Sequence, residues 1–130
     1  MRHALAFLTL TAVLTGCGRD ETISGYADRN VAYRLISGTE QPLNATVAFP
    51  RKGRVEIAAP CGTYRMRQTA PYPWLALENL STRETRCDAG PAETAFLTAL
   101  QSMTVAEVAE GDLLLSNDDG VELFFQDPDA

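Results

Sequence analysis

The stretch "RVEIAAPCGTYRMR" (residues 54–67) contains two short runs in which polar and apolar side chains alternate. Val55 and Ile57 are the apolar members of the first run, and Tyr64 and Met66 are those of the second. A period of two with one charged face is typical of half-buried antiparallel strands. We therefore expect a sheet whose inner face carries these four side chains and whose outer face carries the charged ones.

The same alternation recurs on both sides of this stretch. Further strands are expected at 33–36, 45–49, 74–80 and 105–111, followed by two apolar strands within 112–125. An Asp-Gly pair lies inside the segment 117–120 between those last two strands, and this pair favours a hairpin turn there.

One segment, residues 91–103, has instead the period of a helix. It begins with a proline, and Glu93 suits the positive end of a helix. Phe96, Leu100 and Met103 are spaced to form one apolar stripe. One late helix among antiparallel strands predicts an α+β fold, either a mostly antiparallel sheet or a small open barrel on which the helix packs.

The first residues have the features of an export signal. A positively charged start precedes an uncharged apolar run (4–14) that is too short for a permanent transmembrane helix. The run ends in "LTGC" (14–17), which is similar to the lipobox of bacterial lipoproteins. That resemblance implies that the signal peptide (1–16) is removed and that the Cys17 thiol carries diacylglycerol, with further acyl chains such as palmitate giving a stable membrane anchor. The alternative is an ordinary secretory signal, and the chain is exported in either case.

The signal also indicates location and domain organisation. Gly18, rather than Asp, after the cysteine resembles outer-membrane sorting, so we expect a lipid-anchored protein of the bacterial cell envelope that faces the periplasm. Residues 17–31 are polar and are expected to be the lipidated N-terminus and a flexible tether. The folded domain is expected over 32–125, and 126–130 is expected to be a frayed polar tail.

Composition limits the class of partner. The chain has 11 basic and 17 acidic residues, and removing residues 1–16 takes away one basic residue, which leaves a net charge of -7. A nucleic-acid-binding protein needs a basic face to neutralise phosphates, so we expect no nucleic-acid partner. The negative net charge also indicates that the folded domain does not lie flat on anionic lipid.

The single histidine, His3, lies in the signal peptide. The exported chain therefore lacks the base of Ser-His-Asp and Cys-His systems and the histidine ligands of common zinc and iron sites. Its one lysine, Lys52, lies in an expected turn, which is a poor place to desolvate a base. We expect no enzymatic activity, no catalytic residue, no bound metal and no cofactor.

Four segments resemble one known family. They are "PCGTYR" (60–65), "STRETRC" (81–87), "PAETAFLTAL" (91–100) and "GDLLLSNDDGVELFF" (111–125), and their order is that of the META domain of HslJ-like bacterial lipoproteins. The residues that match the family's motifs are Cys61, Tyr64, Thr82, Arg83, Cys87, Glu93, Phe96, Leu97 and Leu100.

The resemblance covers residues 32–125. It implies a small α+β domain dominated by antiparallel strands, located in the cell envelope and associated with stress tolerance. It implies no defined reaction.

Two cysteines remain besides Cys17. An even number in an oxidising compartment favours a disulfide between Cys61 and Cys87. Two free buried thiols are the alternative, and a catalytic thiol would need a base that the exported chain lacks.

Arginines flank both cysteines. A disulfide would bring Arg65, Arg67, Arg83 and Arg86 together as a candidate contact for an anion or a partner. The alternative is a solvated strand face on which the arginines pair with glutamates across strands. The glutamates concerned are Glu56, Glu78 and Glu84.

The segment "TAPYPW" (69–74) is the candidate contact loop, with Tyr72 and Trp74 as its contact residues. Core packing is the alternative for Trp74. We expect a non-enzymatic envelope lipoprotein that acts as a binding or structural module in stress tolerance. The alternative function is an inhibitor or sequestering protein that acts on an exported enzyme or a small ligand. An inhibitor should have a protruding loop with few internal contacts, and a ligand binder should have an apolar pocket.

Overall fold

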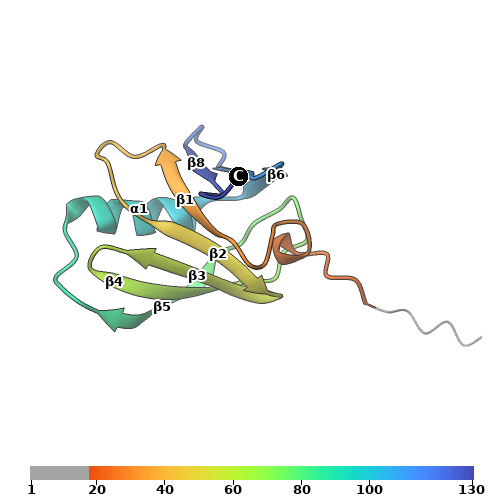
Figure 1. Ribbon diagram of the computed structural model, residues 1–130, viewed down its shortest axis with the longest axis horizontal. Coiled ribbons are helices and arrows are strands. Elements are labelled where there is room, and N and C mark those ends of the chain that lie inside the picture. The colour runs from red at the N-terminus through yellow and green to blue at the C-terminus, as the bar shows by residue number, and fades with distance from the viewer. Residues whose placement is uncertain (1–17) are drawn as a thin grey trace, which may run out of the picture.

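The computed structural model describes residues 18–130, so the predicted signal peptide and Cys17 lie outside the described residues. Eight strands form one sheet in the order β5-β4-β3-β2-β1-β8-β7-β6, and neighbouring strands are antiparallel (Figure 1). The elements are η1 (Ile23–Gly25), β1 (Ala32–Ser37), β2 (Thr46–Arg51), β3 (Gly53–Ala59), β4 (Gly62–Gln68), β5 (Glu78–Thr85), α1 (Pro91–Ser102), β6 (Val105–Ala109), β7 (Asp112–Ser116) and β8 (Glu122–Gln126). The predicted α+β fold with one late helix is confirmed.

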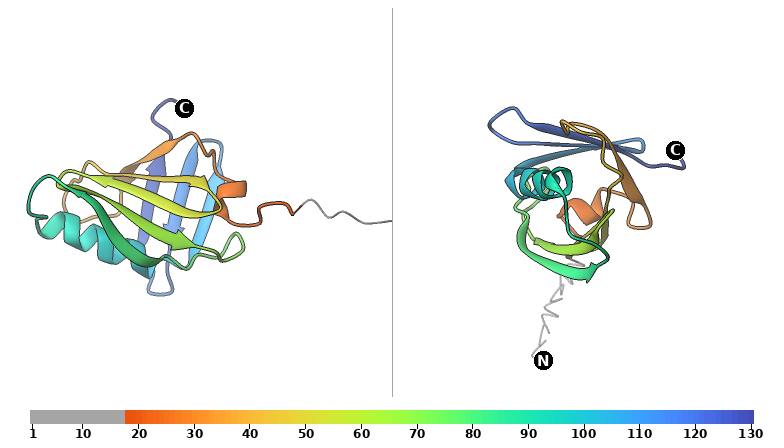
Figure 2. Two further views of the ribbon diagram at one scale, coloured as in Figure 1. Left: turned by 90° about the horizontal axis from the view of Figure 1, so that it is seen from below. Right: turned by 90° about the vertical axis from the view of Figure 1, so that its left-hand side faces the viewer.

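The sheet curls into an open barrel. β1 pairs with β8, so the first and last strands lie side by side, with Arg34 opposite Gln126. The helix α1 lies across the open side of the curled sheet (Figure 2). The segment after β4 closes part of the remaining gap, because the Leu75 N–H donates to the Thr104 carbonyl and the Ala106 N–H donates to the Pro73 carbonyl, each at 2.8 Å.

The core lies between the inner face of the sheet and α1. The four apolar side chains of β3 and β4 predicted to face inward are all buried. Phe96, Leu100 and Met103 of the predicted helical stripe are at most 1% exposed. The rings of Phe96 and Phe125 lie 6.3 Å apart, which joins α1 to the last strand.

The strand predicted at 74–80 is misplaced, since β5 begins at Glu78 and runs to Thr85. Every residue of β5 is exposed, so this edge strand has no alternation of apolar and polar side chains that a sequence pattern could reveal. Leu75 and Leu77 suggested the strand because they are apolar. They lie instead in the loop before β5, and their side chains are buried in the core.

The prediction of a flexible tether over 17–31 is wrong for most of that range. The short helix η1 packs against the barrel, and Ile23 and Ala27 are 1% and 8% exposed. Residues 18–31 contain too few apolar side chains for the sequence pattern to predict a core segment, but Ile23 and Ala27 both pack in the barrel interior.

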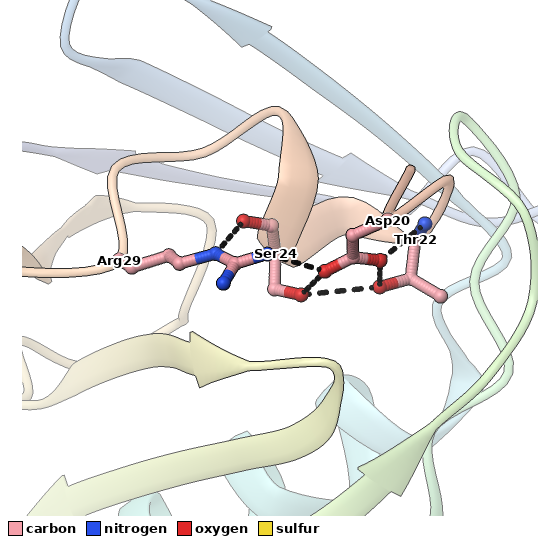
Figure 3. A network of polar contacts seen from close by, with 4 residues as sticks. All are labelled: Asp20, Thr22, Ser24 and Arg29. Atoms are coloured by element: carbon pink, nitrogen blue, oxygen red, sulfur yellow. Dashed lines mark hydrogen bonds and ion pairs between the residues drawn. The ribbon is translucent and has the colours of Figure 1, made fainter. Parts of the chain in front are cut away.

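A network of polar contacts around Asp20 holds this segment in place (Figure 3). The Asp20 carboxylate accepts hydrogen bonds from the Thr22 N–H at 2.9 Å, the Thr22 hydroxyl at 2.6 Å and the Ser24 hydroxyl. Arg29 forms an ion pair with it at 2.9 Å and also donates to the Ser24 carbonyl. Burial raises the pKa of Asp20, but the hydrogen bonds from Ser24 and Thr22 and the charge of Arg29 together outweigh burial and lower it.

The predicted polar tail is also attached to the barrel. Gln126 belongs to β8, and the Asp127 N–H donates to the Gly111 carbonyl at 2.8 Å. The tail therefore continues the β7–β8 pairing for one further hydrogen bond before it turns.

Candidate functional site

Cys61 and Cys87 form a disulfide, as the even number of cysteines predicted, with their Cα atoms 4.6 Å apart. The bond links the turn after β3 to the segment that leads into α1. The N–H groups of Arg86 and Cys87 also donate to the Cys61 carbonyl, at 2.8 Å and 3.3 Å. This end of the barrel is thus held by one covalent bond and two hydrogen bonds.

Glu93 is the buried polar centre of the same end. Its side chain is 3% exposed, and its carboxylate accepts hydrogen bonds from the Cys61 N–H at 2.8 Å and the Tyr64 hydroxyl at 2.5 Å. Glu93 is the third residue of α1, so the positive end of the helix also favours its charge. The hydrogen bond to Glu93, followed by burial, raises the pKa of Tyr64 to about 12.

From the sequence, Glu93 was expected at the start of the helix and as one residue of the family's helix motif, but not as a buried hydrogen-bond acceptor. The signal that could have found its role is its position three residues before Phe96, which puts it on the buried stripe of the helix. Its carboxylate hydrogen-bonds to Cys61 and Tyr64, so Glu93 connects α1 to β4 and to the disulfide.

A basic face covers the outer side of β3, β4 and β5. Arg65 and Arg67 point outward as predicted, and Arg54 lies directly opposite Arg67 on the neighbouring strand. A groove of about 670 Å³ runs between the β2–β3 turn and the start of β5. We define the basic face as Arg51, Lys52, Arg54, Arg65, Arg67 and Arg83; the first five line this groove, and Arg83 lines a second groove that shares Arg65.

Pairing with glutamates is weak on this face. Glu56 is shared by Arg54 and Arg65 at 3.8 Å and 3.9 Å. Burial, followed by the positive charges of Arg51 and Arg65, lowers the pKa of Arg54. The Arg65 Nε is buried without a hydrogen-bond partner among the described residues. The face therefore keeps an excess of positive charge and of unused hydrogen-bond donors.

Arg86 does not belong to the basic face, so the expectation that the disulfide gathers four arginines is wrong for this residue. Its guanidinium donates to the Ala59 carbonyl at 2.6 Å and pairs with Glu84 at 3.4 Å. Arg86 follows the end of β5, and its long side chain turns back to the β3–β4 connection instead of lying on the sheet face.

Tyr72 and Trp74 lie in the loop between β4 and β5. Trp74 is 58% exposed, so it is not the core residue that one alternative proposed. Tyr72 is fixed on three sides: its N–H donates to the Glu21 carbonyl, its hydroxyl accepts from the Val108 N–H, and its ring stacks on Tyr26 with the centroids 4.2 Å apart.

The amide of Gln68 ties the same loop from inside. Gln68 is 1% exposed, its Nε2 donates to the Ala70 and Trp74 carbonyls, and its Oε1 accepts from the Ala76 N–H. The contact loop is therefore fixed to the barrel by many internal contacts, and Trp74 projects from a rigid base.

Within residues 18–130, no three His, Cys, Asp or Glu side chains gather as a metal site. No helix in this range is long and apolar enough to cross a bilayer. The sequence model of the META domain matches residues 29–130. The chain belongs to the META-domain family. No curated protein and no solved structure matches it.

The META domain of this chain has two distinct ends. The motif residues Cys61, Tyr64, Cys87 and Glu93 converge at the end where the disulfide lies. The β2–β3 turn, the 69–77 loop and η1 lie together at the opposite end, from which the chain extends toward its N-terminus (Figures 1 and 2). The helix η1 precedes the matched range, so the family resemblance alone would not have revealed it.

Proposed function

We propose that this META-domain protein is a non-enzymatic envelope lipoprotein, anchored by lipid on Cys17, that serves as a binding or structural module in stress tolerance. The basic face is the observation that carries the binding role. Six cationic side chains lie on the outer side of the sheet and in the β2–β3 turn, and among residues 18–130 only Glu56 forms an ion pair with any of them, at 3.8 Å and 3.9 Å. Arginine donors that outnumber the carboxylates around them suit phosphate or carboxylate groups of a partner.

Two further features support location in the envelope. The lipobox-like "LTGC" (14–17) precedes the domain, and the Cys61–Cys87 bond suits an oxidising compartment. The alternative of an inhibitor has less support, because its candidate loop is bound to the barrel by Gln68 and Tyr72.

A small-molecule binder also has less support than a surface that meets a charged partner. The groove of about 670 Å³ is lined by arginines, a lysine and small polar residues. Ligand pockets are concave and bury most of a small ligand, whereas this groove is shallow and open to solvent.

Affinity capture with crosslinking from native envelopes tests the proposal. Mass measurement of the purified protein should show Cys17 acylated, and the variant Cys17→Ala should lose membrane association. A strain that carries Arg65→Gln/Arg67→Gln should lose the crosslinked anionic partner and tolerate envelope stress less well, while Arg34→Gln serves as the charge control. An unacylated protein, or equal stress tolerance with and without the gene, would overturn the proposal.

A further inference from the structure

The order of the segment around Asp20 limits how far the domain can stand from a membrane. Asp20 is fixed by Thr22, Ser24 and Arg29, and it lies three residues after Cys17. Three residues span at most about 11 Å. This distance is close to the screening length of about 8 Å at physiological ionic strength, so a chain anchored at Cys17 holds its near end within the electrostatic field of the headgroups.

Charge is distributed unevenly over the barrel. Residues 51–83 contain six basic and two acidic side chains, a net charge of +4. Residues 104–130 contain eight acidic side chains and no basic one, a net charge of -8. Residues 18–31 are nearly balanced, with two basic and three acidic side chains. The net charge of the whole chain therefore conceals a basic half and an acidic half.

The basic half and the first described residues lie at the same end of the barrel. The β2–β3 turn, which carries Arg51 and Lys52, lies at the end where η1 packs against the barrel (Figure 2). The 69–77 loop lies there too, and the hydrogen bond from the Tyr72 N–H to the Glu21 carbonyl joins it directly to the segment around η1.

Exposed aromatic side chains gather at this same end. Trp74 is 58% exposed and Tyr26 is 40% exposed, and Tyr26 stacks on Tyr72. Trp and Tyr favour the membrane–water interface, because one part of the side chain is apolar and the other part forms hydrogen bonds. A rigid base below Trp74 lowers the entropic cost of inserting it.

We propose that this end of the META domain docks on anionic phospholipid, with Arg51, Lys52 and Arg54 contacting headgroup phosphates and Trp74 entering the interface. The proposal rests on the proposed function, in that the Cys17 anchor brings this end to the membrane. An acidic protein partner would match the positive charge and the exposed aromatic side chains, but it would not account for the short distance to the anchor.

Vesicle binding of residues 18–130 tests the docking without the lipid anchor. This part contains the whole described sheet, α1 and a core of 23 buried hydrophobic residues, so it folds as a unit. Trp74 is the only tryptophan of the chain and reports its own surroundings. With vesicles that contain about 30% phosphatidylglycerol in phosphatidylcholine, Trp74 fluorescence should shift to the blue and be quenched by brominated acyl chains. Vesicles of phosphatidylcholine alone should produce neither change.

Charge variants locate the contact. Each basic residue near a membrane surface contributes about fivefold to partitioning, so Arg51→Gln/Lys52→Gln should weaken binding roughly 30-fold. Both residues are exposed in a turn, so the fold should tolerate the change. The matched control, Arg34→Gln/Arg86→Gln, removes the same charge from β1 and from the disulfide end and should bind like the parent. The melting temperature of each variant is measured first, so that only folded proteins are compared.

Three results would overturn the docking proposal. They are no binding to phosphatidylglycerol vesicles, equal binding by the turn variant and the parent, or binding without quenching of Trp74. Capture of an acidic envelope protein through the same arginines, with no vesicle binding, would assign the basic face to a protein. Loss of Cys17 acylation would refute the anchor and leave the vesicle result standing, so the two proposals can fail separately.

Discussion

Removing the Cys61–Cys87 bond should lower the stability of the domain by an amount that the structure allows us to calculate. The two cysteines are 26 residues apart in the sequence. Closing a loop of that length lowers the entropy of the unfolded chain by about 12 cal/mol/K, which corresponds to about 3.5 kcal/mol at 25 °C. The unfolding entropy of 113 described residues is about 0.24 kcal/mol/K, so the melting temperature should fall by about 15 °C.

Thermal melts followed by circular dichroism measure this shift. Residues 18–130 contain Cys61 and Cys87 as their only cysteines, so reductant acts on this bond alone. Cys61→Ala/Cys87→Ala should melt at the temperature of the reduced parent, and reductant should leave the melting temperature of this variant unchanged.

The Cys61 N–H also donates to Glu93, so the disulfide and the buried carboxylate should be coupled. A loss clearly above 3.5 kcal/mol that shrinks when Glu93→Gln is already present would measure this coupling. A shift of only about 3 °C, or labelling of both thiols in the unreduced protein, would refute the reasoning that the bond constrains the unfolded chain.

Three further predictions concern the Tyr64–Glu93 hydrogen bond, the Asp20 network and Gly38. Glu93 raises the pKa of Tyr64 from 10 to about 12, so the stability from this hydrogen bond should be complete below pH 10 and lost as the pH rises to 12. The variant Glu93→Gln should lower the pKa of the last tyrosine to titrate, followed by ultraviolet absorbance, back toward 10. The same variant should destabilise the domain by about 2 kcal/mol. The pKa of Asp20 is lowered, so Asp20→Asn should destabilise the domain near neutral pH, and the difference from the parent in urea melts should shrink as the pH falls below about 4. Gly38→Ala should cost more than 1 kcal/mol in the same melts, because a Cβ at Gly38 would lie 2.1 Å from the Glu122 carbonyl oxygen and the residue has φ of +113°; equal stability of variant and parent would contradict the close approach of β1 and β8.

Strands with one buried face could be predicted from the sequence. Val55, Ile57, Tyr64 and Met66 alternate with charged residues, and a strand at the centre of a curled sheet has to show that alternation because one of its faces meets the core. The helical stripe was predictable for the same reason. β5 was not, because an edge strand whose side chains are all exposed places no apolar requirement on its residues.

The sites differ in the same way. A disulfide follows from the number of cysteines and the oxidising compartment that the signal-like start predicts, so Cys61 and Cys87 could be paired before the structure was known. The position of Arg86 could not, because its hydrogen bond to the Ala59 carbonyl joins two parts of the chain that are 27 residues apart in the sequence. The ordered segment around Asp20 could not be predicted either. Its polar residues form hydrogen bonds and an ion pair with one another, but their composition is that of a linker.

The pairing of β1 with β8 has a consequence for the order of folding. Arg34 and Gln126 are partners in the sheet, so the barrel cannot close until nearly the whole chain is present. Long-range pairing of this kind slows folding, because the loop has to close before its contacts stabilise it. For an exported chain, as proposed, slow closure is useful: a nascent polypeptide that lacks its last strand stays open enough to pass through a translocation channel. If the chain is exported in this way, the barrel is completed and the cysteines are oxidised on the far side of the membrane.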